Sequence, residues 1–292
     1  MNITIQNRIE DLLEHFTGKR REVKLSKIGG GSINEAFKLS VEGRTLFVKC
    51  NTNSPGPNFF NCEAKGLKLL RGTINSPKVW HVEDNDEFSL MILDFIEKSY
   101  PNNRFWENFG FSLAKLHQNY AKNYGLEYDN YMGSLPQKNI TEKPLSWVEF
   151  FITKRLMPQV EMAVNNNLLD AEELKDFEKL YAKLPNILIE EKPTLVHGDL
   201  WSGNFLPSTN SEVVLFDPAV YYGNREVDIA MTYLFGGFED VFYESYHHML
   251  PLEEDDIETR LDIYNIYPLM VHVNLFGKTY YHGIKKVIDR IC

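Results

Sequence analysis

The sequence has few of the features typical of a secreted protein, a membrane protein or a protein stabilised by a structural metal. Its 292 residues include three cysteines, Cys50, Cys62 and Cys292, without C-x-x-C or Cys/His spacing, which argues against a disulfide framework and a zinc site. The longest apolar run, at 90–93, is far shorter than the roughly 20 residues of a membrane span. The N-terminus lacks the basic and apolar regions of a signal peptide. We therefore expect a protein of the reducing cytoplasm.

Low-complexity composition is also absent, because glycine (18) and proline (13) are scarce and 43% of the residues are hydrophobic. Positive charge is in short supply as well: 31 Lys and Arg stand against 41 Asp and Glu, a formal net charge of -10. Such a charge repels nucleic acid and anionic lipid, and we expect neither as a partner. An anionic small ligand would need local backbone N–H groups, a placed lysine or a bridging metal.

Residue periodicity divides the chain into a sheet-rich part and a helix-rich part. Helices are predicted at 3–16 and 59–71, and strands at 23–28, 36–41, 45–49, 79–82 and 88–95. Further on, helices are predicted at 104–119, 147–166, 171–184 and over most of the remainder, with short strands at 194–196 and 213–216 and loops at 120–144 and 186–193. The predicted fold class is α+β and bilobal, with a small antiparallel-sheet lobe at 1–96 and a larger helical lobe at 97–292.

The strongest motif is HGDLWSGN at 197–204, which lies between two predicted strands. Asp199 and Asn204 have the spacing of the Asp and Asn in the protein-kinase catalytic loop, and Asp217 follows later in the chain. Phosphoryl transfer needs a carboxylate that accepts the proton of the attacking hydroxyl, and hard oxygen ligands for Mg²⁺. Asp199 fits the base, and Asn204 and Asp217 fit the metal. The alternative, that these are turn-capping residues, explains one of them more easily than all three in this order.

A glycine cluster at 29–34 lies between two predicted strands, so its backbone N–H groups could approach a phosphate. Lys49 ends the next strand and Glu63 lies in the following helix, the order of a phosphate-binding lysine held by a helix glutamate. Residues 93–96 lie where the two lobes would join, and their backbone could bond an adenine edge. Each feature alone has an ordinary explanation, as a hairpin glycine, a solvated lysine or a helix-face glutamate. Their joint order favours a nucleotide-dependent phosphotransferase.

These motifs resemble the fructosamine kinase (ketosamine kinase) family, which is related to the aminoglycoside and choline phosphotransferases of the protein-kinase-like fold. The likeness is carried by HGDLWSGN at 197–204, DPAVYYGNREVDIAMTYLFGGF at 217–238 and GGGSIN at 29–34, and it extends to GLEYDNYMGSLPQKN at 125–139 and YPLMVHVNLFGKTYY at 267–281. The resemblance implies a protein-kinase-like fold and the cofactors ATP and Mg²⁺. It also implies phosphorylation of a sugar hydroxyl, typically O3, of small-molecule or protein-bound ketosamines, a deglycation repair.

By motif position, the resemblance gives each candidate residue a role. Asp199 matches the catalytic base, Asn204 and Asp217 match the magnesium ligands, and Lys49 with Glu63 matches the phosphate-positioning pair. The remaining candidates are Gly30, Gly31 and Ser32 of the glycine loop and Asp94, Phe95 and Ile96 of the adenine-binding hinge for ATP, and Trp201, Asp129 and Gln137 for the sugar-amine side.

Two positions depart from the family pattern. Ser32 stands where many members carry a cysteine, so a thiol-based redox control proposed for such members would be absent. Asn224 stands where many members carry histidine, and because asparagine is a strong helix N-cap we interpret it as structural. Asp228 is then the predicted buried organiser of the catalytic loop. Kinases of aminoglycosides, choline, homoserine or sugars and a non-catalytic nucleotide-binding protein stay open as alternatives, as do the ketosamine sugar and the oligomeric state.

Overall fold

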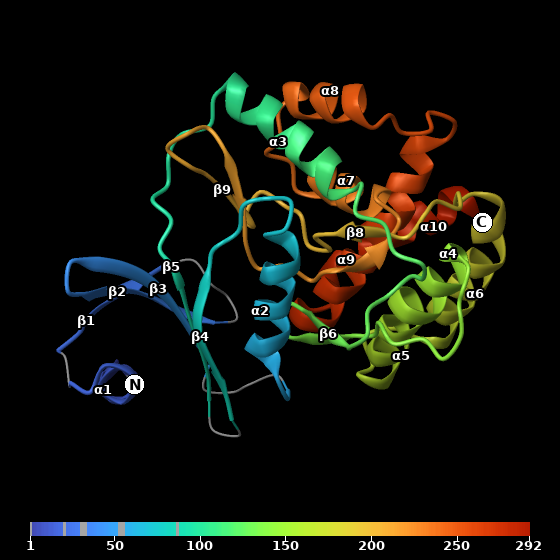
Figure 1. Ribbon diagram of the computed structural model, residues 1–292. Helices are drawn as coiled ribbons and strands as arrows, with labels where there is room; N and C mark the ends of the chain where they lie inside the picture. Colours follow the sequence, from blue (N-terminus) through green and yellow to red (C-terminus); the bar gives the residue numbers. More distant parts are fainter. Residues whose placement is uncertain (1, 20–21, 30–33, 52–55, 86–87) are drawn as a thin grey trace.

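Five strands near the N-terminus form one antiparallel sheet with the order β1-β2-β3-β5-β4 (Figure 1). The computed structural model describes residues 2–19, 22–29, 34–51, 56–85 and 88–292, so the predicted nucleotide-binding residues Gly30, Gly31 and Ser32 lie outside the described part. The strands are β1 (Lys24–Ile28), β2 (Glu35–Val41), β3 (Arg44–Asn51), β4 (Val79–Asp84) and β5 (Ser89–Asp94). They follow the predicted strands to within a few residues, as a period-2 pattern allows.

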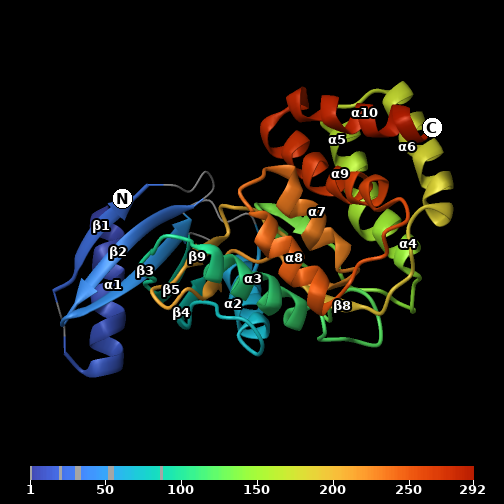
Figure 2. The same cartoon turned by 90° about the horizontal axis from the view of Figure 1, so that it is seen from above.

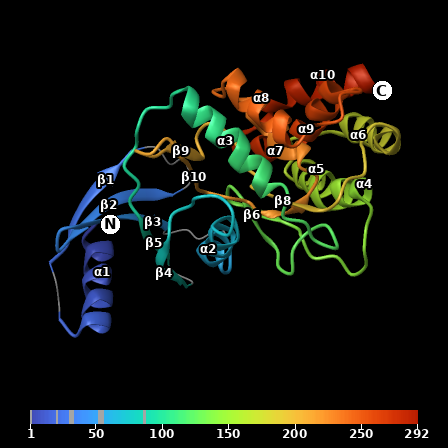
Figure 3. The same ribbon diagram turned by 45° about the horizontal axis from the view of Figure 1, so that its top comes forward.

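Two helices cover opposite faces of this sheet, α1 (Asn2–Thr17) and α2 (Phe59–Leu70) (Figures 1 and 3). Successive side chains of a strand point to opposite faces. In β5, Leu90 and Ile92 join the cluster that contains Ile9 of α1, whereas Met91 and Leu93 join the phenylalanines of α2. The four central residues of β5, 90–93, are therefore all apolar because both faces of the strand are buried.

Helices dominate the rest of the chain, which lies to one side of the sheet (Figure 2). The helix α3 runs along α8, and α9 packs against α5, α7 and α10. The helices are α3 (Asn103–Leu116), α4 (Trp147–Phe150), the π-helix η1 (Phe151–Leu156), α5 (Met157–Asn165), α6 (Ala171–Lys183), the 3₁₀-helix η2 (Leu184–Asn186), α7 (Glu226–Leu234), α8 (Asp240–Met249), α9 (Ile257–Phe276), the 3₁₀-helix η3 (Lys278–Tyr280) and α10 (Tyr281–Ile291).

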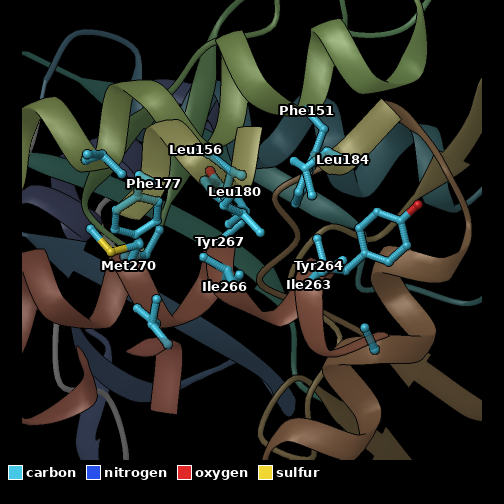
Figure 4. Packing of buried hydrophobic residues seen from close by; sticks show 14 of the residues in the cluster. Phe151, Leu156, Phe177, Leu180, Leu184, Ile263, Tyr264, Ile266, Tyr267 and Met270 are labelled. Carbon is cyan, nitrogen blue, oxygen red and sulfur yellow. The ribbon is translucent and has the colours of Figure 1, made fainter. Parts of the chain in front are cut away.

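The largest apolar cluster lies between α9, α6 and the continuous η1–α5 segment (Figure 4). Phe151, Leu156, Phe177, Leu180 and Ile266 are all fully buried there. Deleting one such side chain costs about 2–5 kcal/mol, because close-packed neighbours do not refill the space. The same cluster includes Val196 and Ala219, which lie at the polar loops 197–204 and 216–220.

The prediction of a loop at 120–144 is wrong in part. The predicted loop at 120–144 contains a hairpin, β6 (Asn130–Met132) and β7 (Leu135–Gln137). Each strand has three residues, too few for alternation to be detected. The predicted helix at 147–166 is confirmed, since the chain is helical from Trp147 to Asn165. Its middle, η1, is a π-helix, a detail that has no sequence signature of its own.

Four more short strands form two separate pairs. They are β8 (Thr194–Val196), β9 (Phe205–Pro207), β10 (Val213–Leu215) and β11 (Tyr221–Gly223), with β8 paired to β11 and β9 to β10. The architecture agrees with the predicted α+β class. No helix within the described residues combines the length and the apolarity needed to cross a membrane.

Candidate active site

The two strand pairs hold the loop 197–204 beside the segment 216–220. The loop 197–204 runs from β8 to β9, and the segment 216–220 runs from β10 to β11. Because β8 pairs with β11 and β9 with β10, the two loops start and end side by side. The backbone N–H of Phe216 also donates to the carbonyl of Asn204 at 3.1 Å. Residues far apart in sequence, Asn204 and Asp217, are thus brought to one place.

This close approach depends on one glycine. Gly198 has a φ of 80°, and a Cβ there would lie 2.2 Å from the carbonyl oxygen of Ala219. Any other residue would clash and be strained. Asp217 itself has a φ of 54°, in the left-handed region that costs a non-glycine residue about 1 kcal/mol or more. Strain of this kind collects where function requires a particular side-chain direction.

Asp228, on α7, anchors the start of the loop 197–204 and is 1% exposed. Its carboxylate accepts hydrogen bonds from the backbone N–H groups of His197 at 2.7 Å and Gly198 at 2.8 Å. It also contacts Nε2 of His117 at 3.1 Å, and Nδ1 of that buried histidine contacts the Tyr246 hydroxyl at 2.8 Å. The prediction that Asp228 organises the loop is confirmed, and His117 is a buried structural histidine that contacts the Asp228 carboxylate.

The predicted structural role of Asn224 is also confirmed. Its side-chain oxygen accepts a hydrogen bond from the N–H of Glu226 at 2.9 Å, at the start of α7, and the residue is fully buried. The amide nitrogen of the same side chain donates to the carbonyl of Ile189 at 3.3 Å. Asn224 therefore fixes the start of the helix from which Asp228 projects.

Lys49 joins the sheet to the loop that carries Asp217. From β3, its Nζ lies 2.8 Å and 2.9 Å from the two carboxylate oxygens of Glu63 on α2, and 2.8 Å from Oδ1 of Asp217. The helix α2 lies close to the same loop, since a Cβ on Gly66 would be 3.2 Å from Pro218. The predicted pairing of Lys49 with Glu63 is thus present, together with an ion pair to Asp217 that spacing alone did not indicate.

The charge of Lys49 is stabilised although the residue is only 5% exposed. Burial alone lowers the pKa of a lysine, but the negative charges of Asp217 and Glu63 outweigh burial and raise the pKa of Lys49 above its ordinary value. Burial in turn raises the pKa of Glu63, and the lysine opposes that change. The result is a fixed ammonium group at the floor of the site.

Asp199 and Asn204 are joined directly. The Asn204 Nδ2 donates to the carboxylate Oδ2 of Asp199 at 2.9 Å and to the backbone carbonyl of Asp199 at 2.8 Å. With its nitrogen turned toward Asp199, Asn204 keeps its amide oxygen for another partner. Burial, with the charges of Asp217 and Asp228, raises the pKa of Asp199 to about 7, although the Asn204 hydrogen bond lowers it. A carboxylate with a pKa near neutrality is matched to general-base catalysis.

One cavity of about 520 Å³ collects most of the predicted residues. It runs between the sheet and the loops 197–204 and 216–220, a size and position typical of a small-molecule site. Its lining includes Lys49, Glu63, Asp94, Phe95, Ile96, Asp199, Trp201, Asn204 and Asp217, along with Gly29 and Asn34 from the two ends of the glycine cluster.

The predicted hinge lines one end of the cavity. The Asp94 side chain is already used, because it accepts from the indole of Trp80 at 2.7 Å and from the N–H of Lys78 at 3.0 Å. The N–H of Asp94 donates to the Lys78 carbonyl at 3.0 Å. Phe95 and Ile96 make no such backbone pairs among the described residues, so their N–H and C=O groups are the ones that could meet an adenine edge.

Trp201 also lines the cavity and is 38% exposed. Its ring lies against the backbone of the same loop, since a Cβ on Gly203 would be 2.3 Å from the indole. The flat side chain is therefore held over the mouth of the cavity. Its place fits the predicted contact with the sugar-amine side.

The predicted substrate residues Asp129 and Gln137 do not line the cavity. The Asp129 carboxylate accepts hydrogen bonds from the N–H groups of Asn139 at 2.7 Å and Ile140 at 3.1 Å, and it pairs with Lys138. These bonds and the Lys138 ammonium lower the pKa of Asp129 although burial opposes them. Asp129 thus closes the turn around its own hairpin.

Gln137 is 1% exposed, and its amide bridges the hairpin to the Asp217 loop. Its Nε2 donates to the Ala219 carbonyl and to Asn130 at 2.9 Å, and its Oε1 accepts from the Tyr267 hydroxyl at 2.9 Å. Asn130 donates to the Val220 carbonyl at 2.9 Å. Gln137 supports the segment after Asp217 from behind. The sequence did not indicate the roles of Asn130 and Tyr267. Their hydrogen bonds join segments that are far apart in the chain, so no regular spacing connects them.

The donor set at the cavity suits magnesium. Asp217 supplies a carboxylate and Asn204 an amide oxygen, both hard ligands of the kind that Mg²⁺ prefers. Within the described residues there is no group of three or more His, Cys, Asp or Glu that could hold a metal alone. Mg²⁺ commonly uses one or two protein ligands and completes its shell with phosphate oxygens and water. The residues therefore fit a metal that arrives with a nucleotide.

Comparisons with known proteins agree with this geometry. The sequence model of the fructosamine kinase family matches residues 5–292. A probable ketoamine kinase of Enterococcus faecium is 34% identical over 268 residues, covering 91% of this chain and 94% of that protein. The chloroplastic protein-ribulosamine 3-kinase of Arabidopsis thaliana is 35% identical, covering 93% of this chain and 84% of that protein.

Solved structures give the same result. A protein assigned as a fructosamine-3-kinase in Haemophilus somnus has a TM-score of 0.85 at 30% identity, covering 97% of this chain and 96% of that one. The aminoglycoside phosphotransferase APH(4)-Ia has a TM-score of 0.63 at 13% identity, covering 97% of this chain and 98% of that one, which shows a common fold. The predicted bilobal, kinase-like fold is confirmed. This chain belongs to the fructosamine kinase family.

Proposed function

We propose that this protein transfers the γ-phosphoryl group of ATP to a sugar hydroxyl, O3, of a ketosamine. The observation that carries the proposal is one cavity in which Lys49 from the sheet bonds Asp217, while Asp199 and Asn204 face the same space. A phosphate-binding cation, a general base and metal ligands are the groups that phosphoryl transfer requires. Membership of the fructosamine kinase family supports the ketosamine as acceptor.

In this proposal Asp199 is the catalytic base. The sugar hydroxyl hydrogen-bonds to the Asp199 carboxylate, its oxygen attacks the γ-phosphorus, and its proton passes to Asp199. The bond to the β-phosphate oxygen breaks and ADP leaves. The bond between Asn204 Nδ2 and Asp199 Oδ2, 2.9 Å long, keeps the carboxylate oriented. The chain contributes mainly by positioning the reactants and neutralising charge.

The nucleotide is bound by residues of the sheet. Lys49, held by Glu63, contacts the phosphates, and the backbone of Phe95 and Ile96, after Asp94, meets the adenine edge. We propose further that Gly30, Gly31 and Ser32 cover the phosphates, since backbone N–H groups free of a Cβ can approach them. The nucleotide lobe is then 1–96, and the catalytic and acceptor lobe is 97–292.

Asn204 and Asp217 would hold Mg²⁺, which when bound neutralises the charge that develops on the phosphates. Asp217 is suited to this because its left-handed backbone turns the carboxylate toward Lys49 and the cavity. The ion pair with Lys49 holds one oxygen of the Asp217 carboxylate, Oδ1, in place beside the cavity. Asn204, 5% exposed, is held in place by its hydrogen bonds to Asp199.

On the acceptor side, Trp201 is the residue we propose to contact the sugar or its amine. Asp129 and Gln137 affect the acceptor indirectly, because their hydrogen bonds position the hairpin and the Asp217 loop. The acceptor includes ketosamines attached to protein as well as small molecules. We propose the cytoplasm as the place of action, consistent with three cysteines that are all free thiols.

The first experiment is Mg²⁺-dependent turnover of ATP with a panel of acceptors. The panel contains fructose-lysine, ribulose-lysine, kanamycin, choline and a control without acceptor. We expect turnover with one or both ketosamines alone and a phosphate on O3 of the product by NMR. Turnover with kanamycin or choline alone would show that the acceptor is not a ketosamine. Undetectable turnover with every acceptor would reject the proposed reaction.

A further inference from the structure

Five aromatic rings form a continuous band on the surface beside the mouth of the cavity. We call it the aromatic strip. Its consecutive ring centroids are 5.9, 5.3 and 5.5 Å apart, and the last ring touches the two before it at 6.2 and 5.0 Å. In order along the strip the residues are Trp201, Phe235, His272, Phe276 and Tyr280.

The strip is assembled from segments distant in sequence. Trp201 lies in the catalytic-motif loop, Phe235 follows α7, His272 and Phe276 are on the last turns of α9, and Tyr280 ends η3. Phe235 and Phe276 are 42% and 50% exposed. Neither ring belongs to the apolar clusters that form the core of the described residues.

Contiguity separates this strip from ordinary exposed aromatics. Single apolar residues on a surface are common and need no explanation. Tyr233, for example, is 54% exposed, but among the described residues its ring stacks only on Tyr243, at 4.4 Å, and it does not line the cavity. A connected apolar band that begins at a binding cavity is typical of a recognition surface.

We propose that the aromatic strip binds the peptide chain that carries the ketosamine, with an apolar side chain close to the modified lysine. This inference rests on the proposed function. Trp201 belongs both to the lining of the cavity and to the strip. A sugar held at Asp199 is covalently joined to its amine, so whatever the amine carries emerges at Trp201 and continues over the neighbouring rings.

The dimensions and the chemistry suit a peptide. The strip matches about four to five residues of extended chain at a rise of about 3.3 Å each. Nδ1 of His272 lies 2.8 Å from the carbonyl of Pro268, and since a carbonyl only accepts, Nδ1 carries the proton. Nε2, which has no hydrogen bond to a described residue, is left as an acceptor for a peptide N–H.

Charge argues against the other occupants of such a surface. With a net charge of -10, a second copy of the chain and an anionic lipid are both repelled. A peptide brought to the strip by its own ketosamine needs no such attraction, because the bound sugar raises its local concentration.

The test compares two peptides that carry the same ribulose-lysine, or fructose-lysine if the acceptor panel favours it. One peptide has leucine and phenylalanine after the modified lysine, and the other has serine and glycine there. For the enzyme without substitutions we expect kcat/KM to be about five- to tenfold higher with the apolar peptide. Partial burial of one or two large apolar side chains gives a preference of this size. Equal values for the two peptides would overturn the proposal.

Variants then assign the preference to the strip. Phe276→Ser should reduce the ratio of the two kcat/KM values to nearly one, and Phe276→Tyr, which keeps the ring, should restore it. Tyr233→Ser is the matched control, similar in exposure but outside the strip, and should leave the ratio unchanged. An unchanged ratio in Phe276→Ser, or the same loss in Tyr233→Ser, would overturn the proposal.

Two further outcomes are distinguishable. If neither peptide nor any free ketosamine is phosphorylated, the proposed function itself fails. If sedimentation shows a dimer that Phe276→Ser dissociates, the strip is covered by a second copy and the peptide proposal is wrong. Turnover of both peptides without a preference keeps the proposed function and rejects only the strip.

Discussion

Replacing Asp199 by asparagine should remove activity while stabilising the fold. The pKa of this carboxyl is raised to about 7 by burial and by the charges of Asp217 and Asp228, against an ordinary value of about 3.9 in the unfolded chain. The folded state therefore binds the proton more tightly than the unfolded state does. The stabilisation that this provides is present below about pH 4 and is lost as the pH rises through about 7.

The size of the effect follows from the same shift. Three pKa units correspond to about 4 kcal/mol, which is an upper limit because the carboxylate is partly exposed. An asparagine removes the charge and can still accept the Asn204 hydrogen bond through its own oxygen. At pH 8, without nucleotide or Mg²⁺, we expect Asp199→Asn to raise the free energy of unfolding by about 2 kcal/mol, a difference that shrinks as the pH falls to 4.

Urea unfolding at several pH values measures the stability, and steady-state ATP turnover measures the activity. The same variant should lose at least about 10²-fold in kcat, the usual contribution of a general base. A kcat loss below threefold would show that Asp199 is not the base. A variant less stable than the natural protein at pH 8 would show that the buried carboxylate is not under strain.

Asp228→Asn is the matched control, an identical change at a carboxylate with a different role. Asp228 is 1% exposed and accepts two backbone N–H bonds, at 2.7 and 2.8 Å. An amide turns its NH₂ group toward at least one of these donors, and each buried N–H left without an acceptor costs about 1–3 kcal/mol. We expect this variant to lose both activity and about 3 kcal/mol of stability, whereas a gain in stability would refute the anchoring role.

Three shorter predictions follow from the same geometry. Gly198→Ala should cost about 3 kcal/mol in urea unfolding because its Cβ would meet the Ala219 carbonyl, whereas Gly43→Ala, with a similar positive φ but open space, should cost only about 1 kcal/mol. Lys49→Met should lower kcat/KM for ATP by about 10²-fold, with Lys49→Arg losing less, and equal kinetics would refute phosphate binding by this residue. Chelation by EDTA should abolish turnover, and Mg²⁺ should restore it better than Ca²⁺, which prefers longer bonds and more ligands.

The fold was predictable where each element buries a regular pattern. Strands β3 and β5 and helix α2 pack on one another through faces whose spacing is visible in the sequence, so their limits agree within a few residues. The hairpin β6–β7 was not predictable, because it is stabilised by hydrogen bonds of Gln137 and Asn130 to the carbonyls of Ala219 and Val220. Those contacts depend on the tertiary structure, and three-residue strands have no periodicity.

The candidate site shows the same division. Lys49, Glu63, Asp199, Asn204 and Asp217 could be chosen from their types and order, and they line one cavity. What order could not indicate is how they are held in position. That depends on buried hydrogen bonds between elements remote in sequence. Examples are the bonds that run from Asp228 to the loop backbone and to the ring of His117, which follows α3.

The charges around the cavity predict that the nucleotide needs a divalent metal to bind. Of the described residues that line it, four are acidic (Glu63, Asp94, Asp199 and Asp217) and one is basic (Lys49), a formal sum of -3 when all are ionised. A nucleotide polyphosphate brings more negative charge to a protein that is already acidic overall. Lys49 cannot compensate alone, because Glu63 and Asp217 already use its ammonium group. Binding of ATP should therefore weaken steeply without Mg²⁺. When the metal binds, its positive charge should lower the pKa of the Asp199 carboxyl. The proton that Asp199 retains near neutral pH should then be released. The acidity of the empty site should therefore favour the metal-bound nucleotide over the metal-free one.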